Sequence, residues 1–205
     1  MARSNAGTKG VPRLDRETQI LDVASVAFGT EGYAATSVAD IADRAGISKP
    51  LVYNYFGSKD GLFLACIERA GAVLAEEIER VARLDAVGIQ RGVNTLAAMF
   101  DLLEQQRHLW RIVIDPTAPT SGPIADATAS YTARITTLAR EGVSEMLAVS
   151  GVNDTLDVDA MTRVWLGIVD SLMAWWVEHP DQSAEQMLRR CVRLITALFD
   201  VGARR

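Results

Sequence analysis

The chain has 205 residues, of which 49% are hydrophobic, and this composition is that of a well-packed globular protein rather than a disordered one. Its formal net charge of −5 argues against a protein that coats nucleic acid regardless of sequence, because such binding relies on neutralising phosphates. No apolar run reaches the ~18 residues of a membrane span and no signal peptide is visible, so we expect a cytoplasmic protein without a membrane partner.

The N-terminus is the only basic part of the chain. Residues 1–13 carry Arg3, Lys9 and Arg13 and no acidic residue. We interpret residues 1–14 as a flexible basic arm, and such arms enter the minor groove of DNA in other proteins. The alternative interpretation is a disordered tail that keeps the protein in solution.

Apolar residues recur every three or four positions along the chain, and this spacing predicts an all-α protein of about nine helices. The first helix is predicted from Asp15 to about Thr30. A second begins at Ser37, whose hydroxyl is placed to cap it, and ends at Gly46. Ser48 is predicted to cap a third short helix with Pro50 in its first turn.

Two short helices joined by a tight turn form the pattern of a helix-turn-helix. Along the second of them, Lys49 lies four residues before Tyr53, and Pro50 lies four before Asn54, so these side chains share one face. Lysine contacts phosphate or guanine, asparagine pairs with adenine, and tyrosine reaches phosphate. The face therefore suits a DNA major groove, although the same spacing also fits two ordinary helices of a bundle.

A long helix is predicted from Ser58 to about Leu84. Further helices are expected near 88–105, 107–114, 123–149, 155–179 and 183–201. Residues 115–123 contain three prolines and a glycine, which predicts a loop.

The segment that contains these short helices resembles the signature of the tetracycline-repressor (TetR) family. The resemblance covers about residues 15–63 and includes Ile20, Ala24, Phe28 and Gly32-Tyr33, followed by TSVADIADRAGISKPLVYNYFGSKDGLF from Thr36 to Phe63. It implies a helix-turn-helix domain over 15–62, with the motif itself at 37–56, and an effector-binding and dimerisation domain over 63–205. It also implies regulation of transcription, as a repressor that an effector releases from its operator, with activation as the alternative.

The resemblance carries over a set of DNA-binding residues, of which Ser37 and Lys59 are implied to hold phosphates. Pro50 stands where many members of the family have glycine, and Asn54 and Tyr55 occupy positions that vary with the operator, so the operator sequence cannot be read from the chain. The full set is Ser37, Ser48, Lys49, Pro50, Leu51, Tyr53, Asn54, Tyr55 and Lys59.

One helix-turn-helix reads too few base pairs for specificity, so we expect a homodimer on palindromic double-stranded DNA. The last two predicted helices each carry an apolar stripe, which we interpret as a four-helix interface with a second copy. The alternative is that both stripes belong to the core of one chain. The predicted interface residues are Ile168, Leu172, Trp176, Leu188, Cys191, Val192, Ile195, Leu198 and Phe199.

Residues 85–180 are rich in tryptophan and methionine, whose side chains suit a pocket for a small and largely apolar effector. The alternative is ordinary helical core. The predicted effector residues are Met99, Phe100, His108, Trp110, Tyr131, Trp165, Met173 and Trp175.

The two cysteines, Cys66 and Cys191, are predicted to be buried thiols, and His108 and His179 have no neighbours at metal-ligand spacing. No nucleophile–base pair or phosphate loop is visible, so we expect no catalytic residue, no metal and no cofactor. The competing functions are a general DNA-packaging protein, which the overall acidity disfavours, and a helical enzyme. The target genes and the effector are not encoded in any motif.

Overall fold

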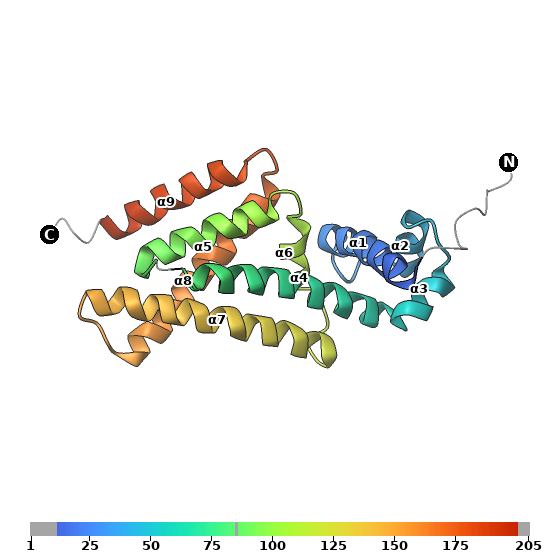
Figure 1. Cartoon of the computed structure of the whole chain (residues 1–205), viewed down its shortest axis with the longest axis horizontal. Helices are drawn as coiled ribbons and strands as arrows, with labels where there is room; N and C mark the ends of the chain where they lie inside the picture. Colours follow the sequence, from blue (N-terminus) through green and yellow to red (C-terminus); the bar gives the residue numbers. More distant parts are fainter. Residues whose placement is uncertain (1–11, 85, 201–205) are drawn as a thin grey trace. The chain divides into compact units, whose positions relative to one another are not determined.

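The computed structural model describes residues 12–84 and 86–200, and side chains as far as residue 197. Helices α1 to α9 and their connections account for these residues, and no strand occurs among them (Figure 1). The described residues divide into two compact units. Unit 1 runs to Gly71 and includes His108–Ala129, whereas unit 2 comprises Ala72–Arg107 and the residues from Ser130 onward.

Unit 1 contains three N-terminal helices: α1 (Arg13–Glu31), α2 (Val38–Arg44) and α3 (Lys49–Phe56). The first part of α4 (Lys59–Ala82), α6 (His108–Val113) and the start of α7 (Pro123–Val149) complete it. The α1 residues Ile20, Ala24 and Phe28 are buried because their four-residue spacing puts them on one face. Phe28 meets Phe63 of α4 edge to face, with 4.8 Å between ring centres.

Within unit 1, α6 lies directly against α1 at Gly29. A Cβ atom added to this glycine would lie 2.3 Å from the carbonyl oxygen of His108. Any side chain at position 29 would therefore separate the two helices. Burial lowers the pKa of His108 below its ordinary value, and the nearby positive charge of Arg69 lowers it further.

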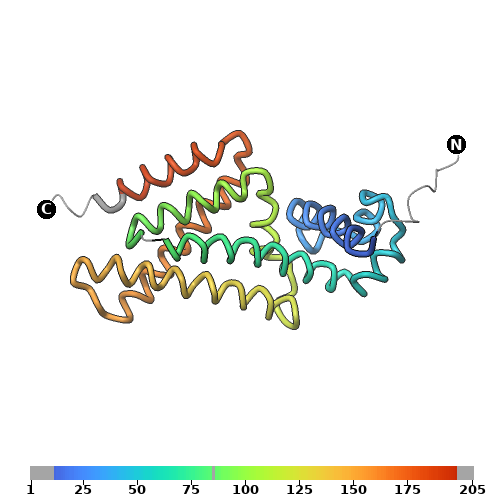
Figure 2. Tube along the Cα trace, viewed as in Figure 1, coloured from blue at the N-terminus to red at the C-terminus, as the bar shows by residue number. Residues whose placement is uncertain are grey.

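Unit 2 is built from the second parts of α4 and α7 together with α5 (Gly88–Leu103), α8 (Thr155–Glu178) and α9 (Ala184–Asp200). α5 and α9 pack along each other, as the Cα trace also shows (Figure 2). Phe100 of α5 and Trp176 of α8 are fully buried and meet edge to face at 5.0 Å. Among the described helices, none combines the length and apolar character that crossing a membrane requires.

The helix pattern predicted from the sequence is confirmed, and most predicted ends lie within two residues of the observed ones. Two local predictions were wrong. Arg13 and Leu14, predicted in the arm, already belong to α1, which starts after Pro12. Ser48 occupies the cap position of α3, but its hydroxyl makes no capping hydrogen bond. Arg3 and Lys9 lie outside the described residues.

Candidate nucleic-acid interface

The turn between α2 and α3 fixes the direction of α3. Gly46 has a φ of 67°, a conformation that L-residues rarely adopt, and the N–H of Ile47 donates to the carbonyl of Ala42 at 3.0 Å. Gln19 of α1 donates its side-chain amide to the carbonyl of Ala45, also at 3.0 Å. α1 therefore braces the turn, and α3 leaves it in a defined direction.

α3 has one buried and one exposed face. Val52 is 1% exposed and anchors the helix, whereas Lys49, Pro50, Tyr53 and Asn54 are all exposed. The Lys49 ammonium lies 5.7 Å from the centre of the Tyr53 ring. The structure thus brings together the four side chains that the sequence assigned to the recognition face.

The other predicted residues of this region flank that face. Ser37 is half-buried and accepts a hydrogen bond from the N–H of Asp40 at 3.1 Å, as its predicted role as a helix cap requires. Ser48 is exposed, and Leu51 and Tyr55 are half-buried. The guanidinium of Arg13 lies 5.3 Å from the Tyr55 ring centre, so the start of α1 adds a positive charge beside α3.

Lys59 begins α4, where a cation and backbone N–H groups together favour an anion. Its ammonium lies 4.4 Å from the centre of the Tyr33 ring and 3.5 Å from the carbonyl oxygen of Ala34. The Tyr33 hydroxyl donates to Asp60 at 2.5 Å, and this hydrogen bond raises the pKa of Tyr33 to about 12. Tyr33 lies within the quoted signature, but no local pattern in the sequence predicts that it is a neighbour of Lys59.

The predicted dimer residues fall into two groups. Trp176, Cys191 and Ile195 are at most 4% exposed, so they belong to the core of unit 2 and offer no surface to a partner. That part of the prediction was wrong, because an apolar stripe does not say which neighbour covers it. Ile168, Leu172 and Leu188 are half-buried and Val192 is 38% exposed. The side chains of Leu198 and Phe199 lie outside the described residues.

The predicted effector residues are not gathered into one place. His108 and Trp110 belong to unit 1, whereas the other six belong to unit 2. Met99, Phe100 and Met173 are buried in the core of unit 2, while Tyr131, Trp165 and Trp175 are half-buried. Trp165 packs against α5 at Gly92, and Trp175 stacks on His179 with 3.8 Å between ring centres.

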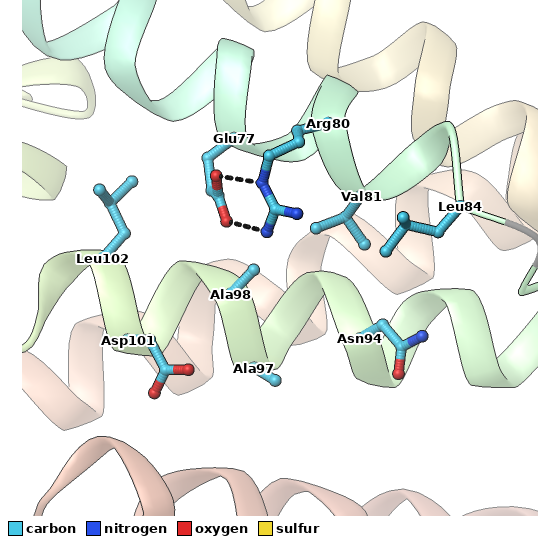
Figure 3. Close-up of a pocket in the computed structure, with 9 residues that line it drawn as sticks. All are labelled: Glu77, Arg80, Val81, Leu84, Asn94, Ala97, Ala98, Asp101 and Leu102. Atoms are coloured by element: carbon cyan, nitrogen blue, oxygen red, sulfur yellow. Dashed lines mark hydrogen bonds and ion pairs between the residues drawn. The ribbon is translucent and has the colours of Figure 1, made fainter.

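A groove of about 430 Å³ lies between α4 and α5 in unit 2 (Figure 3). Its apolar lining is Val81, Leu84, Ala97, Ala98 and Leu102, and its polar lining is Glu77, Arg80, Asn94 and Asp101. The Glu77 carboxylate and the Arg80 guanidinium pair through two hydrogen bonds of 2.6 and 2.8 Å. None of the predicted effector residues lines this groove. Among the described residues, no group of acidic, histidine and cysteine side chains is placed to hold a metal ion.

These elements define a helix-turn-helix domain followed by a helical domain. Residues 20–66 match the family model described as bacterial regulatory proteins, tetR family. The transcriptional activator FasR of Mycolicibacterium smegmatis is 33% identical over 124 residues, which are 60% of this chain and 57% of that protein. The transcriptional repressor BdcR of Escherichia coli is 38% identical over 63 residues, 31% of this chain and 32% of that protein. The chain thus aligns with less than two thirds of either relative.

Solved structures extend the likeness over most of the chain. A TetR/AcrR-family regulator from Thermobifida fusca is 25% identical with a TM-score of 0.64, covering 88% of this chain and 96% of that one. The fold is shared with KstR2 of Mycobacterium tuberculosis, at 20% identity, a TM-score of 0.75 and coverages of 95% and 97%. It is also shared with Bacillus subtilis FadR in complex with stearoyl-CoA, at 18% identity, a TM-score of 0.66 and coverages of 84% and 95%. Residues 20–66, and with them the helix-turn-helix domain, belong to the TetR family of bacterial regulatory proteins.

Proposed function

We propose that this chain is a sequence-specific repressor that binds a palindromic operator as a homodimer and is released by a largely apolar effector. Specific DNA binding is carried by one observation: Lys49, Pro50, Tyr53 and Asn54 are exposed together on α3 while Val52 anchors the helix. The surface around them is not strongly basic, since Asp40, Asp43 and Asp60 are exposed too. Recognition of DNA then depends on contacts from individual side chains to particular DNA groups more than on the total positive charge of the surface.

Whether such a protein represses or activates transcription depends on where its operator lies relative to the promoter, because the same DNA contacts serve both functions. Both kinds of regulator occur among the relatives, since FasR is called an activator and BdcR is called a repressor. Bound sequences selected from random DNA by the full-length protein test the proposal most directly. We expect a palindrome whose half-sites are about 34–36 Å apart, or one helical turn. Binding that enriches no sequence would contradict the proposal.

The exposed faces of α8 and α9 are the proposed dimer interface. Along α8 the exposed residues Ala160, Val164, Gly167, Ser171 and Ala174 follow a helical spacing, and Val164 is 54% exposed. On α9, Val192, one of the predicted interface residues, is 38% exposed, whereas Leu194, which is 46% exposed, lies two residues further on and therefore on another side of the helix. Small residues allow two helices to approach closely, and exposed apolar groups supply area for association.

Gly167→Arg is expected to give a monomer that still folds. A Cβ at Gly167 meets nothing within 4 Å, and arginine favours a helix by about 0.8 kcal/mol over glycine, so the protomer loses no stability. The same side chain would be forced into the proposed interface. Sedimentation equilibrium measures the mass, and Ala133→Arg, at an exposed position of α7, is the matched control. A dimeric Gly167→Arg variant would remove α8 from the interface.

The apolar part of the proposed effector is a long acyl chain, and we propose that it is presented as an acyl-CoA. The groove between α4 and α5 offers an apolar lining for an acyl chain, and its polar groups are Asn94, Asp101 and the paired Glu77 and Arg80. FadR, which shares the fold, was solved with stearoyl-CoA. Release follows if the effector binds better to a protein conformation whose two DNA-binding domains no longer match the operator spacing.

Stearoyl-CoA is expected to dissociate the protein from its selected duplex, whereas CoA alone is expected to have no effect. Fluorescence anisotropy of a labelled duplex measures the release. Ala98→Trp fills the groove from α5 and is expected to abolish the response while leaving DNA affinity unchanged. Equal release of wild type and Ala98→Trp would place the effector elsewhere, and no release by acyl-CoA of any chain length would exclude this class of effector.

A further inference from the structure

The turn that follows α1 presents two successive backbone donors outside any helix. Gly32, at a φ of 83°, ends α1, and the chain then passes through Tyr33 and Ala34 before α2 begins. Tyr33 is half-buried and Ala34 is exposed, and consecutive N–H groups in a turn attract anionic acceptors. Their acceptors come from a segment more than 80 residues further along the chain.

Asp115 and Thr117, in the connection between α6 and α7, supply these acceptors. The Asp115 carboxylate accepts the N–H of Tyr33 at 2.5 Å, and the Thr117 hydroxyl accepts the N–H of Ala34 at 3.1 Å. The other carboxylate oxygen of Asp115 accepts both the N–H and the hydroxyl of Thr117, at 2.8 and 2.7 Å. The two residues therefore hold each other while they hold the turn, and we call them the 115/117 clamp.

The clamped residues, Tyr33 and Ala34, also contact the side chain of Lys59. Its ammonium lies over the Tyr33 ring at 4.4 Å and donates to the Ala34 carbonyl at 3.5 Å. The Tyr33 ring also packs against Phe63 at 5.0 Å between centres, and its hydroxyl binds Asp60. A displacement of the turn would move the ring and the carbonyl together, and the cation between them would follow.

The segment that carries the clamp is itself fixed to α1. α6 rests on Gly29 so closely that a Cβ there would lie 2.3 Å from the His108 carbonyl oxygen. Residues 108–117 thus attach to the DNA-binding unit at both ends: by backbone packing at Gly29 and by hydrogen bonds at Tyr33 and Ala34. The first attachment lies within α1, and the second lies between α1 and α2, the first helix of the motif.

We propose that Asp115 and Thr117 are positioning residues for DNA binding, which hold Lys59 where it meets a backbone phosphate by clamping the Tyr33–Ala34 turn. The inference rests on the proposed function, and it adds two residues far from the helix-turn-helix in sequence. Neither residue needs to touch DNA. Their effect on binding passes through the phosphate contact, so it is sequence-independent and depends on salt.

The test compares full-length variants on the selected duplex and on a random duplex of equal length, at several salt concentrations between about 50 and 200 mM. Lys59→Ala is expected to reduce the slope of log affinity against log salt by about one per protomer. Asp115→Asn keeps the shape but has one acceptor oxygen instead of two, and we expect a similar reduction. The double variant should bind within about twofold of Lys59→Ala alone, because both changes remove the same contact.

Asp126→Asn is the matched control, since it removes the same charge from the exposed first turn of α7. Its salt slope is expected to equal that of the wild type. Amide hydrogen exchange tests the clamp without DNA: Asp115→Asn should speed exchange at Tyr33, and Thr117→Val, which removes only the hydroxyl, should speed it at Ala34. If Asp115→Asn does not fold, Thr117→Val still tests the 115/117 clamp through exchange at Ala34.

The outcomes separate the two proposals. Unchanged exchange at Tyr33 and Ala34 in both variants would overturn the clamp. Faster exchange with a wild-type salt slope would overturn the positioning role while leaving DNA binding intact. If Lys59→Ala also leaves the slope unchanged, or if selection enriches no sequence, the DNA-binding assignment itself fails, and the positioning role fails with it.

Discussion

Exchange of Tyr53 and Asn54 together for alanine is expected to weaken binding to the selected duplex by about 100-fold, because a good base contact contributes ~1–3 kcal/mol of discrimination. A dimer loses such contacts in both half-sites. Both side chains are exposed on α3. Neither packs into the core, because the buried residue of this helix is Val52, on the opposite face. The loss should therefore appear in DNA affinity and not in thermal stability.

The contrast with random DNA identifies what these residues do. Lys49 and Lys59 are unchanged in the double variant, so their phosphate contacts persist, and affinity for a random duplex should fall much less than affinity for the selected duplex, by no more than the phosphate contact of the Tyr53 hydroxyl. Repeating the selection with Asn54→Ala alone should shift the preferred base at one position of each half-site. The measurement is fluorescence anisotropy with both duplexes at one fixed salt concentration.

Tyr131→Ala with Asn153→Ala is the matched control, because it removes the same side-chain types from unit 2. We expect it to bind both duplexes like the wild type. If the Tyr53/Asn54 variant retains wild-type affinity for the selected duplex, the recognition face has been assigned wrongly. A parallel loss on both duplexes would instead make these residues phosphate contacts.

The helices and the recognition face could be predicted from the sequence because both depend on local spacing. Ile20, Ala24 and Phe28 repeat at the helical period, and Lys49 and Tyr53 share a face for the same reason. Glycines at 32, 46 and 57, each with a positive φ, end α1, lie in the α2–α3 turn and end α3, where their flexibility predicted breaks. The spacing of apolar residues predicts which face of a helix is buried, even when the segment that packs against this face is not known.

The remaining site features depend on which segments meet, and spacing does not contain that information. Cys191 and Ile195 form a correct apolar stripe, but the stripe faces the core of unit 2 and not a second copy. Asp115 stands in a loop of prolines and gives no local sign that it accepts the N–H of Tyr33, 82 residues earlier. The signature around residues 36–63 likewise ends before the acceptors that hold its first turn.

Arg107→Ala is expected to lower the free energy of unfolding of unit 2 by about 3 kcal/mol, since hydrogen bonds from a charged donor contribute ~1.5–3 kcal/mol. Arg107 donates to the carbonyls of Trp176 and His179 at 3.0 Å each and to that of Gln182 at 2.6 Å. These carbonyls belong to the end of α8 and the residues after it, where the N–H of His179 donates to Trp176 and the N–H of Gln182 donates to His179, so Arg107 adds a charged donor to carbonyls that end the helix. The guanidinium also lies 3.9 Å from the centre of the Trp176 ring.

The loss extends beyond one side chain because Trp176 depends on the same end of α8. Its indole N–H donates to the Gln182 carbonyl at 2.9 Å, and its ring packs on Phe100. Without Arg107 the connection to α9 would lose the group that joins these carbonyls. Lysine would restore the charge but not the planar fork that reaches three acceptors, so Arg107→Lys should recover less than half of the lost stability.

Urea unfolding followed by tryptophan fluorescence measures this effect where it occurs, because Trp165, Trp175 and Trp176 lie in unit 2 and only Trp110 lies in unit 1. Arg163→Ala is the matched control. Arg163 pairs with Asp159 one helical turn away, but its side chain is 81% exposed, and a surface pair of this kind contributes only ~0–1 kcal/mol. Equal destabilisation by the two substitutions would mean that the carbonyl contacts of Arg107 do not stabilise the end of α8. A loss confined to Arg107 would show that its contacts stabilise the connection between α8 and α9 by more than an exposed ion pair contributes.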